Sequence, residues 1–232
     1  MAFQGYTQQT VDFMWGIRFN NERGWFMEHK DEYINSFLTP TKELGEQVYD
    51  AMHALLPDEP LMLKVSRIYR DARRLFGRGP YKDHLWWCIR TGDKDWTGRP
   101  TFWFELGPDY YSFGLGFWSP AAALMETFRK QIDQHPQELE KLVRQFSKQK
   151  VFTLEGPEYA RSKGQTSDLL RPWYQKKSLT LRWEGPLDER IFLPALAEDI
   201  IEGFKTLMPF YHYFNKIVAL TPQQERTRGE DA

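Results

Sequence analysis

Two runs of alternating side chains on either side of a turn constrain the fold of this chain more than any other feature. Apolar residues at 102, 104 and 106 alternate with Trp103 and Glu105, and those at 111, 113, 115 and 117 alternate with Ser112, Gly114 and Gly116. Gly-Pro-Asp at 107–109 separates the two runs. A period of two around a turn signal predicts an antiparallel β-hairpin. The glycine-bearing side leaves room for a close neighbour, which could be a packed helix, another backbone or a ligand.

The segments before and after this hairpin have helical spacing. Between residues 6 and 56, apolar residues recur at steps of three and four, as in Leu44, Val48 and Met52, and Thr39-Pro40 is a suitable helix start. We expect further helices over 119–132, 139–146 and 187–207, the last bent at Pro194, a separate short helix after Pro209, and strands over 151–154 and 179–183.

These patterns predict a single α+β domain over residues 1–220, with a mainly antiparallel sheet and helices packed against it. With 232 residues and 41% hydrophobic content, the chain is long enough for one substantial core. The polar, aperiodic end at 221–232 is predicted to be a disordered tail. No window approaches the roughly 18 apolar residues of a membrane span. We therefore expect no membrane segment. The single cysteine precludes an intramolecular disulfide, which suits a reducing compartment, so we expect a cytoplasmic protein.

A basic stretch from residue 67 to residue 82 is the main candidate for function. It contains five arginines and one lysine against a single acid, Asp71, and so carries +5 while the whole chain carries −1. As a helix, the stretch would place Arg67, Arg70 and Arg74 on an ordinary solvated face. As a strand that runs into a loop, it would turn Arg67 toward the interior or a cleft. Periodicity alone favours neither arrangement.

If the basic side chains converge, their chemistry favours an anion, because guanidinium groups match carboxylate and phosphate oxygens. In this hypothesis the chain binds an anionic small molecule. Arg67, Arg70 and Arg73 are the donors, Lys82 is a point charge, Tyr81 is a hydrogen-bonding aromatic, and Asp71 orients a guanidinium. Asp71 is also the nearest general-base candidate, should the site be catalytic.

A structural alternative assigns the same arginines to ion pairs. Acids elsewhere in the chain, such as Glu105, Glu184 or Asp109, would then fasten the loop to the sheet. A second functional class is a protein-interaction module that docks an acidic partner on the basic stretch and on exposed aromatics such as Trp96 and Trp103. Nucleic-acid binding ranks last, because the remainder of the chain is acidic.

No motif specifies a reaction, a cofactor or a metal. Gly-Arg-Gly-Pro at 77–80 lacks the spacing of a phosphate-binding P-loop, and the five histidines are scattered. Cys88 lies among Trp86, Trp87 and Ile89, which predicts a buried structural thiol. The sequence therefore predicts no metal site, and it leaves cofactors and turnover open.

Several motifs resemble a widespread bacterial and fungal family of uncharacterised proteins. They are Phe-Gln-Gly-Tyr-Thr at 3–7, Asn-Asn-Glu-Arg-Gly-Trp-Phe at 20–26, Arg-Ile-Tyr-Arg-Asp at 67–71 and Pro-Tyr-Lys at 80–82, in a resemblance that spans nearly the whole chain. The resemblance implies no known activity, but it favours the strand-to-loop arrangement. Residues 73–78 depart from the family's pattern, because they lack its serine, its aspartate and one of its lysines.

Overall fold

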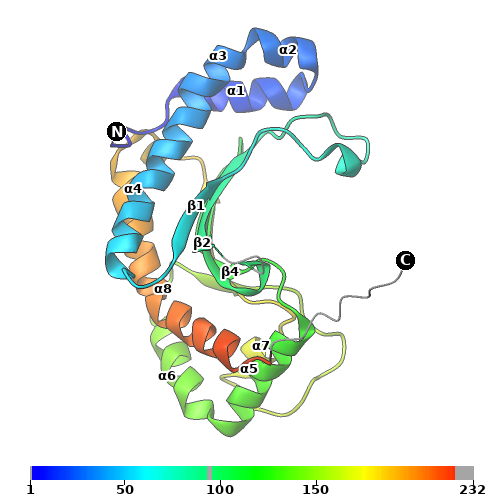
Figure 1. Cartoon of the computed structure of the whole chain (residues 1–232), viewed down its shortest axis with the longest axis vertical. Coiled ribbons are helices and arrows are strands. Elements are labelled where there is room, and N and C mark those ends of the chain that lie inside the picture. The colour runs from blue at the N-terminus through cyan, green and yellow to red at the C-terminus, as the bar shows by residue number, and fades with distance from the viewer. Residues whose placement is uncertain (1, 93–95, 223–232) are drawn as a thin grey trace, which may run out of the picture.

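A curved antiparallel sheet lies at the centre of the computed structural model, which describes residues 2–92 and 96–222 (Figure 1). Its strands are β1 (Leu61–Val65), β2 (Leu85–Thr91), β3 (Pro100–Leu106), β4 (Tyr110–Phe117), β5 (Thr153–Glu155) and β6 (Thr180–Pro186). They lie in the order β1-β2-β3-β4-β6-β5, and every neighbouring pair is antiparallel. The predicted hairpin is therefore confirmed as β3 and β4.

Helices cover one face of the sheet and its two ends. They are α1 (Gln8–Phe19), α2 (Arg23–Glu28), α3 (Lys30–Glu32), a π-helical segment (Tyr33–Leu38), α4 (Thr39–Leu55), α5 (Ala122–Gln134), α6 (Pro136–Phe146), α7 (Arg171–Tyr174) and α8 (Ala195–Leu220), with short 3-10 turns at Ala72–Arg74, Trp96–Gly98 and Glu189–Phe192. In Figure 1, α4 and α8 lie along one face, α1 to α3 lie at one end and α5 to α7 at the other. The α+β class is therefore confirmed.

The main core lies between the sheet and the pair α4 and α8. Trp87 of β2 stacks on Phe104 of β3 and meets Phe204 of α8 edge-on. Gly45 brings α4 close to the sheet, since a Cβ there would lie 3.3 Å from both Leu63 and Trp87. Burial of these large side chains supplies the main driving force for folding. The opposite face of the sheet has no helix packed along it in Figure 1.

The C-terminal helix differs from the prediction at both prolines. The helix expected from residue 187 begins only at Ala195, because Glu189–Phe192 form a 3-10 turn and Leu193 is extended just before Pro194. No separate helix follows Pro209, which lies inside the continuous α8. Proline at this position removes one backbone hydrogen bond and costs about 3 kcal/mol. Pro209 is exposed, however, and the apolar residues on both sides of it are buried, so packing outweighs this cost.

Two glycines in β4 explain the glycine-bearing side of the hairpin. A Cβ at Gly114 would overlap the carbonyl oxygen of Leu181, and one at Gly116 would overlap that of Leu179. The close neighbour is thus the backbone of β6 and the residue before it. Glycine is required here because the two strands approach too closely for any side chain on this face.

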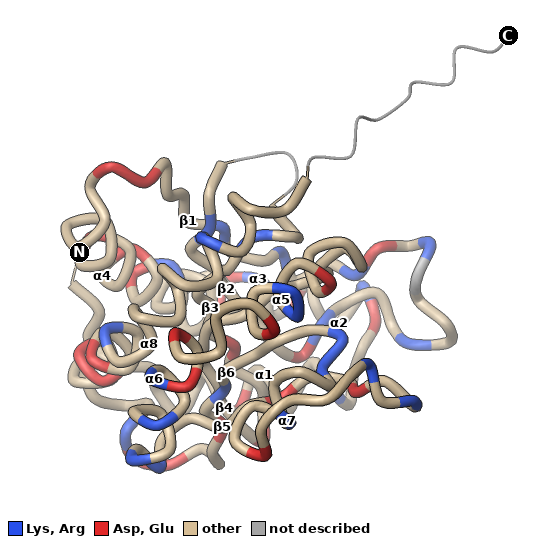
Figure 2. Tube along the Cα trace, turned by 90° about the horizontal axis from the view of Figure 1, so that it is seen from below, with Lys and Arg blue, Asp and Glu red and all other residues tan. Residues whose placement is uncertain are grey.

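Charged residues of both signs are interspersed over the molecule, as Figure 2 shows, in agreement with the net charge of −1. Within residues 2–92 and 96–222, no helix has the length and apolar character needed to cross a membrane. Residues 223–232 of the predicted tail lie outside the described residues.

Candidate functional site

The basic stretch folds as a loop between β1 and β2. The two arms of the loop run side by side: the N–H of Lys82 donates to the carbonyl of Ile68 (2.7 Å), and that of Arg70 donates to the carbonyl of Pro80 (2.8 Å). The only regular element is the 3-10 turn Ala72–Arg74. The stretch therefore runs from a strand into a loop, and the helical alternative is wrong. The predicted inward orientation of Arg67 is also wrong, because Arg67 is exposed. Backbone hydrogen bonds between the arms fix where each side chain begins.

Arg70 is used within the loop. Its Nε donates to the carbonyl oxygen of Tyr81 on the opposite arm (2.7 Å), and its Nη2 lies 3.9 Å from the carboxylate of Asp83. Burial lowers the pKa of Arg70, although an arginine in a protein remains protonated. One edge of the guanidinium therefore holds the two arms together.

Arg73 and Asp71 form an ion pair of their own. Nε and Nη2 of Arg73 both donate to the Asp71 carboxylate, at 3.1 and 2.8 Å. The Arg73 side chain is 88% exposed, so the pair adds little to stability. Asp71 also accepts a hydrogen bond from the Arg73 backbone and so caps the 3-10 turn.

The acids proposed from the sequence as partners of the arginines have other partners. Glu105 accepts a hydrogen bond from Tyr110, Glu184 pairs with Arg182, and Asp109 pairs with Arg18. The partner of Arg73 is instead Asp71, which lies near it in the sequence, and that of Arg70 is Asp83, which lies at the other end of the loop.

Tyr81 anchors the loop to the N-terminal helices. Its backbone N–H and carbonyl bond to the Asn21 side-chain amide, both at 2.9 Å. Its ring is buried and stacks on Phe26 with the ring centres 4.3 Å apart. The ring predicted to face a ligand thus packs in the core.

Lys82 and Arg67 retain unpaired charge. The Lys82 Nζ lies 5.7 Å from the centre of the Trp86 ring. Burial, Arg70 and Arg67 lower the pKa of Lys82 to about 8, while Glu105 acts in the opposite direction. Within the described part of the chain, neither Lys82 nor Arg67 forms an ion pair. The loop therefore gathers positive charge around a half-buried ammonium group.

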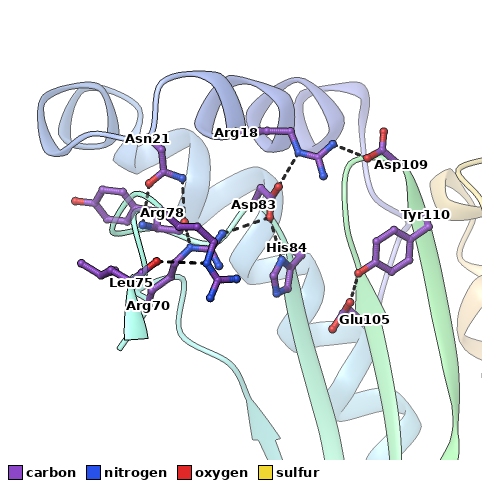
Figure 3. Close-up of polar contacts among 11 residues, drawn as sticks. Arg18, Asn21, Arg70, Leu75, Arg78, Asp83, His84, Glu105, Asp109 and Tyr110 are labelled. Carbon is purple, nitrogen blue, oxygen red and sulfur yellow. Dashed lines mark hydrogen bonds and ion pairs between the residues drawn. The ribbon is translucent and has the colours of Figure 1, made fainter. Parts of the chain in front are cut away.

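Asp83 organises the polar network beside Lys82 (Figure 3). It accepts hydrogen bonds from His84 Nδ1 (3.0 Å) and from Arg18 Nε (2.7 Å), and its side chain is only 16% exposed. The bond from His84 has the largest effect, and together with the bond from Arg18 it holds the pKa of Asp83 well below its usual range. Burial acts in the opposite direction but is outweighed. The network ties α1, the loop and the start of β2 together.

A pocket of about 450 Å³ lies on the uncovered face of the sheet. Trp86 of β2 and Trp103 of β3 form part of its wall, and Trp96 and Trp118 extend the wall beyond the strands. None of the six residues predicted as ligand contacts lines this pocket. Lys82 does interact with two residues that line the pocket, Trp86 and Glu105.

Arg182 of β6 supplies the main polar group inside the pocket. Its guanidinium lies 5.7 Å from the centre of the Trp103 ring, and its Nη2 lies 3.4 Å from the Ser112 hydroxyl. It also pairs with Glu155 and Glu184. Its Nε is buried and has no hydrogen-bond partner among the described residues.

A family model described as a conserved hypothetical protein family, DUF2461, matches residues 9–213. The chain belongs to this family. The match spans the basic loop and the whole sheet, and it confirms the family resemblance. No curated protein matches the chain.

Sequence reasoning identified only part of the pocket of this DUF2461 protein. The sequence predicts Trp96 and Trp103 as docking aromatics, whereas no sequence pattern marks Trp86, Trp118 or Arg182. In β2 both faces are apolar, so alternation does not mark which tryptophan faces the pocket. The signal that could have identified the uncovered face is the alternation of Trp103 and Glu105 in β3.

Cys88 lies in the pocket wall of the DUF2461 protein but is buried, and burial raises the pKa of its thiol to about 11. The thiol is therefore protonated at neutral pH and is a poor nucleophile. Within residues 2–92 and 96–222, no group of three or more His, Cys, Asp or Glu side chains is arranged to hold a metal ion.

Proposed function

We propose that this DUF2461 protein binds an anionic small molecule on the uncovered face of its sheet. A planar or apolar part would lie between the tryptophans, and a carboxylate or phosphate would lie near Lys82. The observation that carries the proposal is the position of Lys82, a half-buried ammonium without an ion-pair partner among the described residues, beside two residues that line the pocket.

Electrostatics supports an anion at this edge. Arg67 and Arg70 lie close enough to lower the Lys82 pKa, and a bound negative charge would offset that repulsion. Lys82 and Arg67 would act on the anion directly, and Arg70 would add to the positive potential. Arg73, Asp71 and Tyr81 would contribute through the shape of the loop.

Shape and chemistry of the pocket support the remainder of the ligand. Its volume of about 450 Å³ is in the range of pockets that hold small molecules. Tryptophan rings offer flat surfaces for stacking, and the Arg182 side chain adds a positive charge to the lining. The proposal is for binding and assigns no reaction.

A second candidate is a protein-interaction module, favoured by Phe76 at the loop. This side chain is 82% exposed, and its backbone has a φ of 46°, a conformation that is unusual for a residue with a side chain. An acidic partner could cover Phe76 and the nearby Arg73. Nucleic acid remains the least favoured ligand. The lone, buried Cys88 supports a reducing, cytoplasmic setting.

The proposal is tested by a thermal-shift screen of nucleotides, sugar phosphates, aromatic carboxylates and short oligonucleotides, at low and moderate salt. Compounds that raise the melting temperature are then titrated by tryptophan fluorescence. The parent, Lys82→Met and Trp103→Leu are compared. Lys205→Met serves as the matched control, because Lys205 is an exposed lysine of α8 that pairs with Glu202.

We expect a small anion to bind the parent and the control equally. Lys82→Met should bind it about 10- to 100-fold more weakly, as for loss of one charge-assisted hydrogen bond, and Trp103→Leu about 2- to 10-fold more weakly, as for loss of one aromatic contact. The proposal is wrong if no small molecule stabilises the parent, or if the affinity survives both site substitutions. Binding confined to oligonucleotides, with a steep dependence on salt, would favour the nucleic-acid alternative instead.

A further inference from the structure

Three positive charges surround the ring of Tyr159, away from the basic loop. The Arg129 guanidinium carbon lies 5.1 Å from the ring centre, the Lys163 Nζ 4.4 Å and the Lys177 Nζ 5.6 Å. Arg129 belongs to α5, and the two lysines lie on either side of α7 in the sequence. Segments that are distant in the sequence thus bring three cations to one aromatic ring.

Backbone hydrogen bonds hold this arrangement in place. The N–H of Tyr159 donates to the carbonyl of Gln175 (3.0 Å), and the N–H of Lys177 donates to the carbonyl of Pro157 (2.7 Å). The N–H of Lys163 donates to the side-chain oxygen of Gln175 (3.3 Å). The backbone positions of Tyr159, Lys163 and Lys177 are therefore fixed relative to one another. The fold brings the two ammonium groups to the same ring.

None of the three cations forms an ion pair among the described residues. The nearby acids are engaged elsewhere: Glu126 pairs with Lys130, Glu158 pairs with Lys176, and Asp133 accepts the hydroxyl of Tyr174. In addition, Arg129 Nη1 is buried and has no hydrogen-bond partner among the described residues. Lys130 chiefly, and Arg129 to a smaller degree, lower the pKa of Glu126, so the charge of Arg129 is partly offset, whereas the two lysines have no ion-pair partner in the part of the chain that the structure describes.

The Tyr159 ring attracts each cation, but it cannot complete the site. Attraction to a ring face does not neutralise three positive charges. An oxyanion would neutralise them, since its several oxygens accept bonds from guanidinium and ammonium groups at the same time. A dianion fits a cluster of three cations better than a monoanion does.

A second pocket, of about 290 Å³, lies beside Lys163. It is lined mainly by polar side chains, among them Ser162, Thr166, Arg171 and Gln175. Ser162 directly precedes Lys163, and Gln175 is the residue that binds the Lys163 backbone. The uncharged part of a small polar ligand therefore has a place next to the cations.

We propose that Arg129, Lys163 and Lys177 form a binding site for a phosphate group, either free phosphate or the phosphate of a small sugar ester held in the adjacent polar pocket. This site is separate from the one proposed at Lys82. The segments that carry Tyr159 and Lys177 include Pro157 and Ser178, which line the aromatic pocket near β6. Lys82 lies near β2 instead.

Calorimetric titration and thermal shift test this site with inorganic phosphate, ribose 5-phosphate and ribose, all at one ionic strength maintained with chloride. The parent is compared with Lys163→Met and Lys177→Met, whose side chains are exposed, so that folding should survive. Lys130→Met is the matched control, because Lys130 lies next to Arg129 on α5 but pairs with Glu126. Lys82→Met separates this site from the first.

We expect both phosphates to bind the parent, Lys130→Met and Lys82→Met alike, and at least tenfold more weakly to Lys163→Met and Lys177→Met. Ribose alone should not bind detectably. Without phosphate, Lys163→Met and Lys177→Met should melt at or above the melting temperature of the parent, because each removes one of three mutually repelling positive charges. The proposal is overturned if chloride stabilises the parent as well as phosphate does. It is also overturned if Lys163→Met and Lys177→Met retain the affinity of the parent for phosphate, or if Lys130→Met loses that affinity to the same extent.

Discussion

Substitution of Lys82 by methionine should stabilise the free protein at neutral pH. The pKa of Lys82 is lowered from 10.5 to about 8, chiefly by burial. One pKa unit corresponds to about 1.4 kcal/mol, which sets an upper limit of about 3 kcal/mol on the free-energy cost of the charge. Because part of the side chain reaches solvent, we expect a gain of about 1–2 kcal/mol. Methionine retains the apolar stem that lies against Trp86.

The gain should depend on pH in a defined way. The unfolded chain holds the lysine proton up to a pH near 10.5, whereas the folded chain releases it near pH 8. Between these values the unfolded state binds more protons, so the stability of the parent rises with pH. The advantage of Lys82→Met is therefore complete below the folded pKa and disappears as the pH approaches the unfolded value.

Urea unfolding of the parent and the variant, at several pH values between these two limits, measures this difference directly. Other groups titrate in the same range, but they contribute equally to both proteins and cancel. Lys205→Met, which removes an exposed lysine, should change the free energy of unfolding only slightly. A Lys82→Met protein that is less stable than the parent at neutral pH, or a difference that is flat across the range, would refute the burial argument.

Two further predictions concern the supports of the site. Asp83→Asn should be less stable than the parent near neutral pH. This difference in stability should narrow as the pH falls below 3.8, the ordinary pKa of the carboxyl group, because the group is then protonated in the unfolded chain. Acid titrations followed by circular dichroism measure the difference, and a difference that stays constant would contradict the prediction. Gly114→Ala should lose about 3 kcal/mol or more in urea unfolding, because its Cβ would overlap the Leu181 carbonyl. Gly24→Ala, whose Cβ meets no atom within 4 Å in α2, should match or exceed the parent.

The fold was predictable where local periodicity and tertiary packing agree. The β3–β4 hairpin has a period of two and a turn between its strands, so the sequence indicated its existence, and the structure gives its register. The helix around Pro209 was not predictable in the same way. Local preference argues for a break there, whereas burial of Phe204, Leu207 and Phe210 along one helix face outweighs it. Only the packing partner reveals which effect is larger.

The aromatic pocket was harder to predict because it depends on what does not cover the sheet. Trp86 and Trp87 are adjacent, equally apolar and both in β2, yet one lines the pocket and the other is buried under α8. Nothing in the local sequence pattern indicates that α4 and α8 cover the face of the sheet that carries Trp87 and not the face that carries Trp86. The position of two helices far away in the sequence decides which tryptophan is available to a ligand.

The basic residues show why a local excess of charge is an incomplete guide to a site. In the stretch from 67 to 82, the surplus drew attention, but Arg73 is neutralised two residues away by Asp71, and Arg70 lies beside Asp83. Acids close in sequence are also close in space, so they compensate such runs readily. Arg129, Lys163 and Lys177 form no charge run, and they meet only through the fold. The acids near this cluster, Glu126, Glu158 and Asp133, bind other partners, and a bound anion could then neutralise the charge that remains.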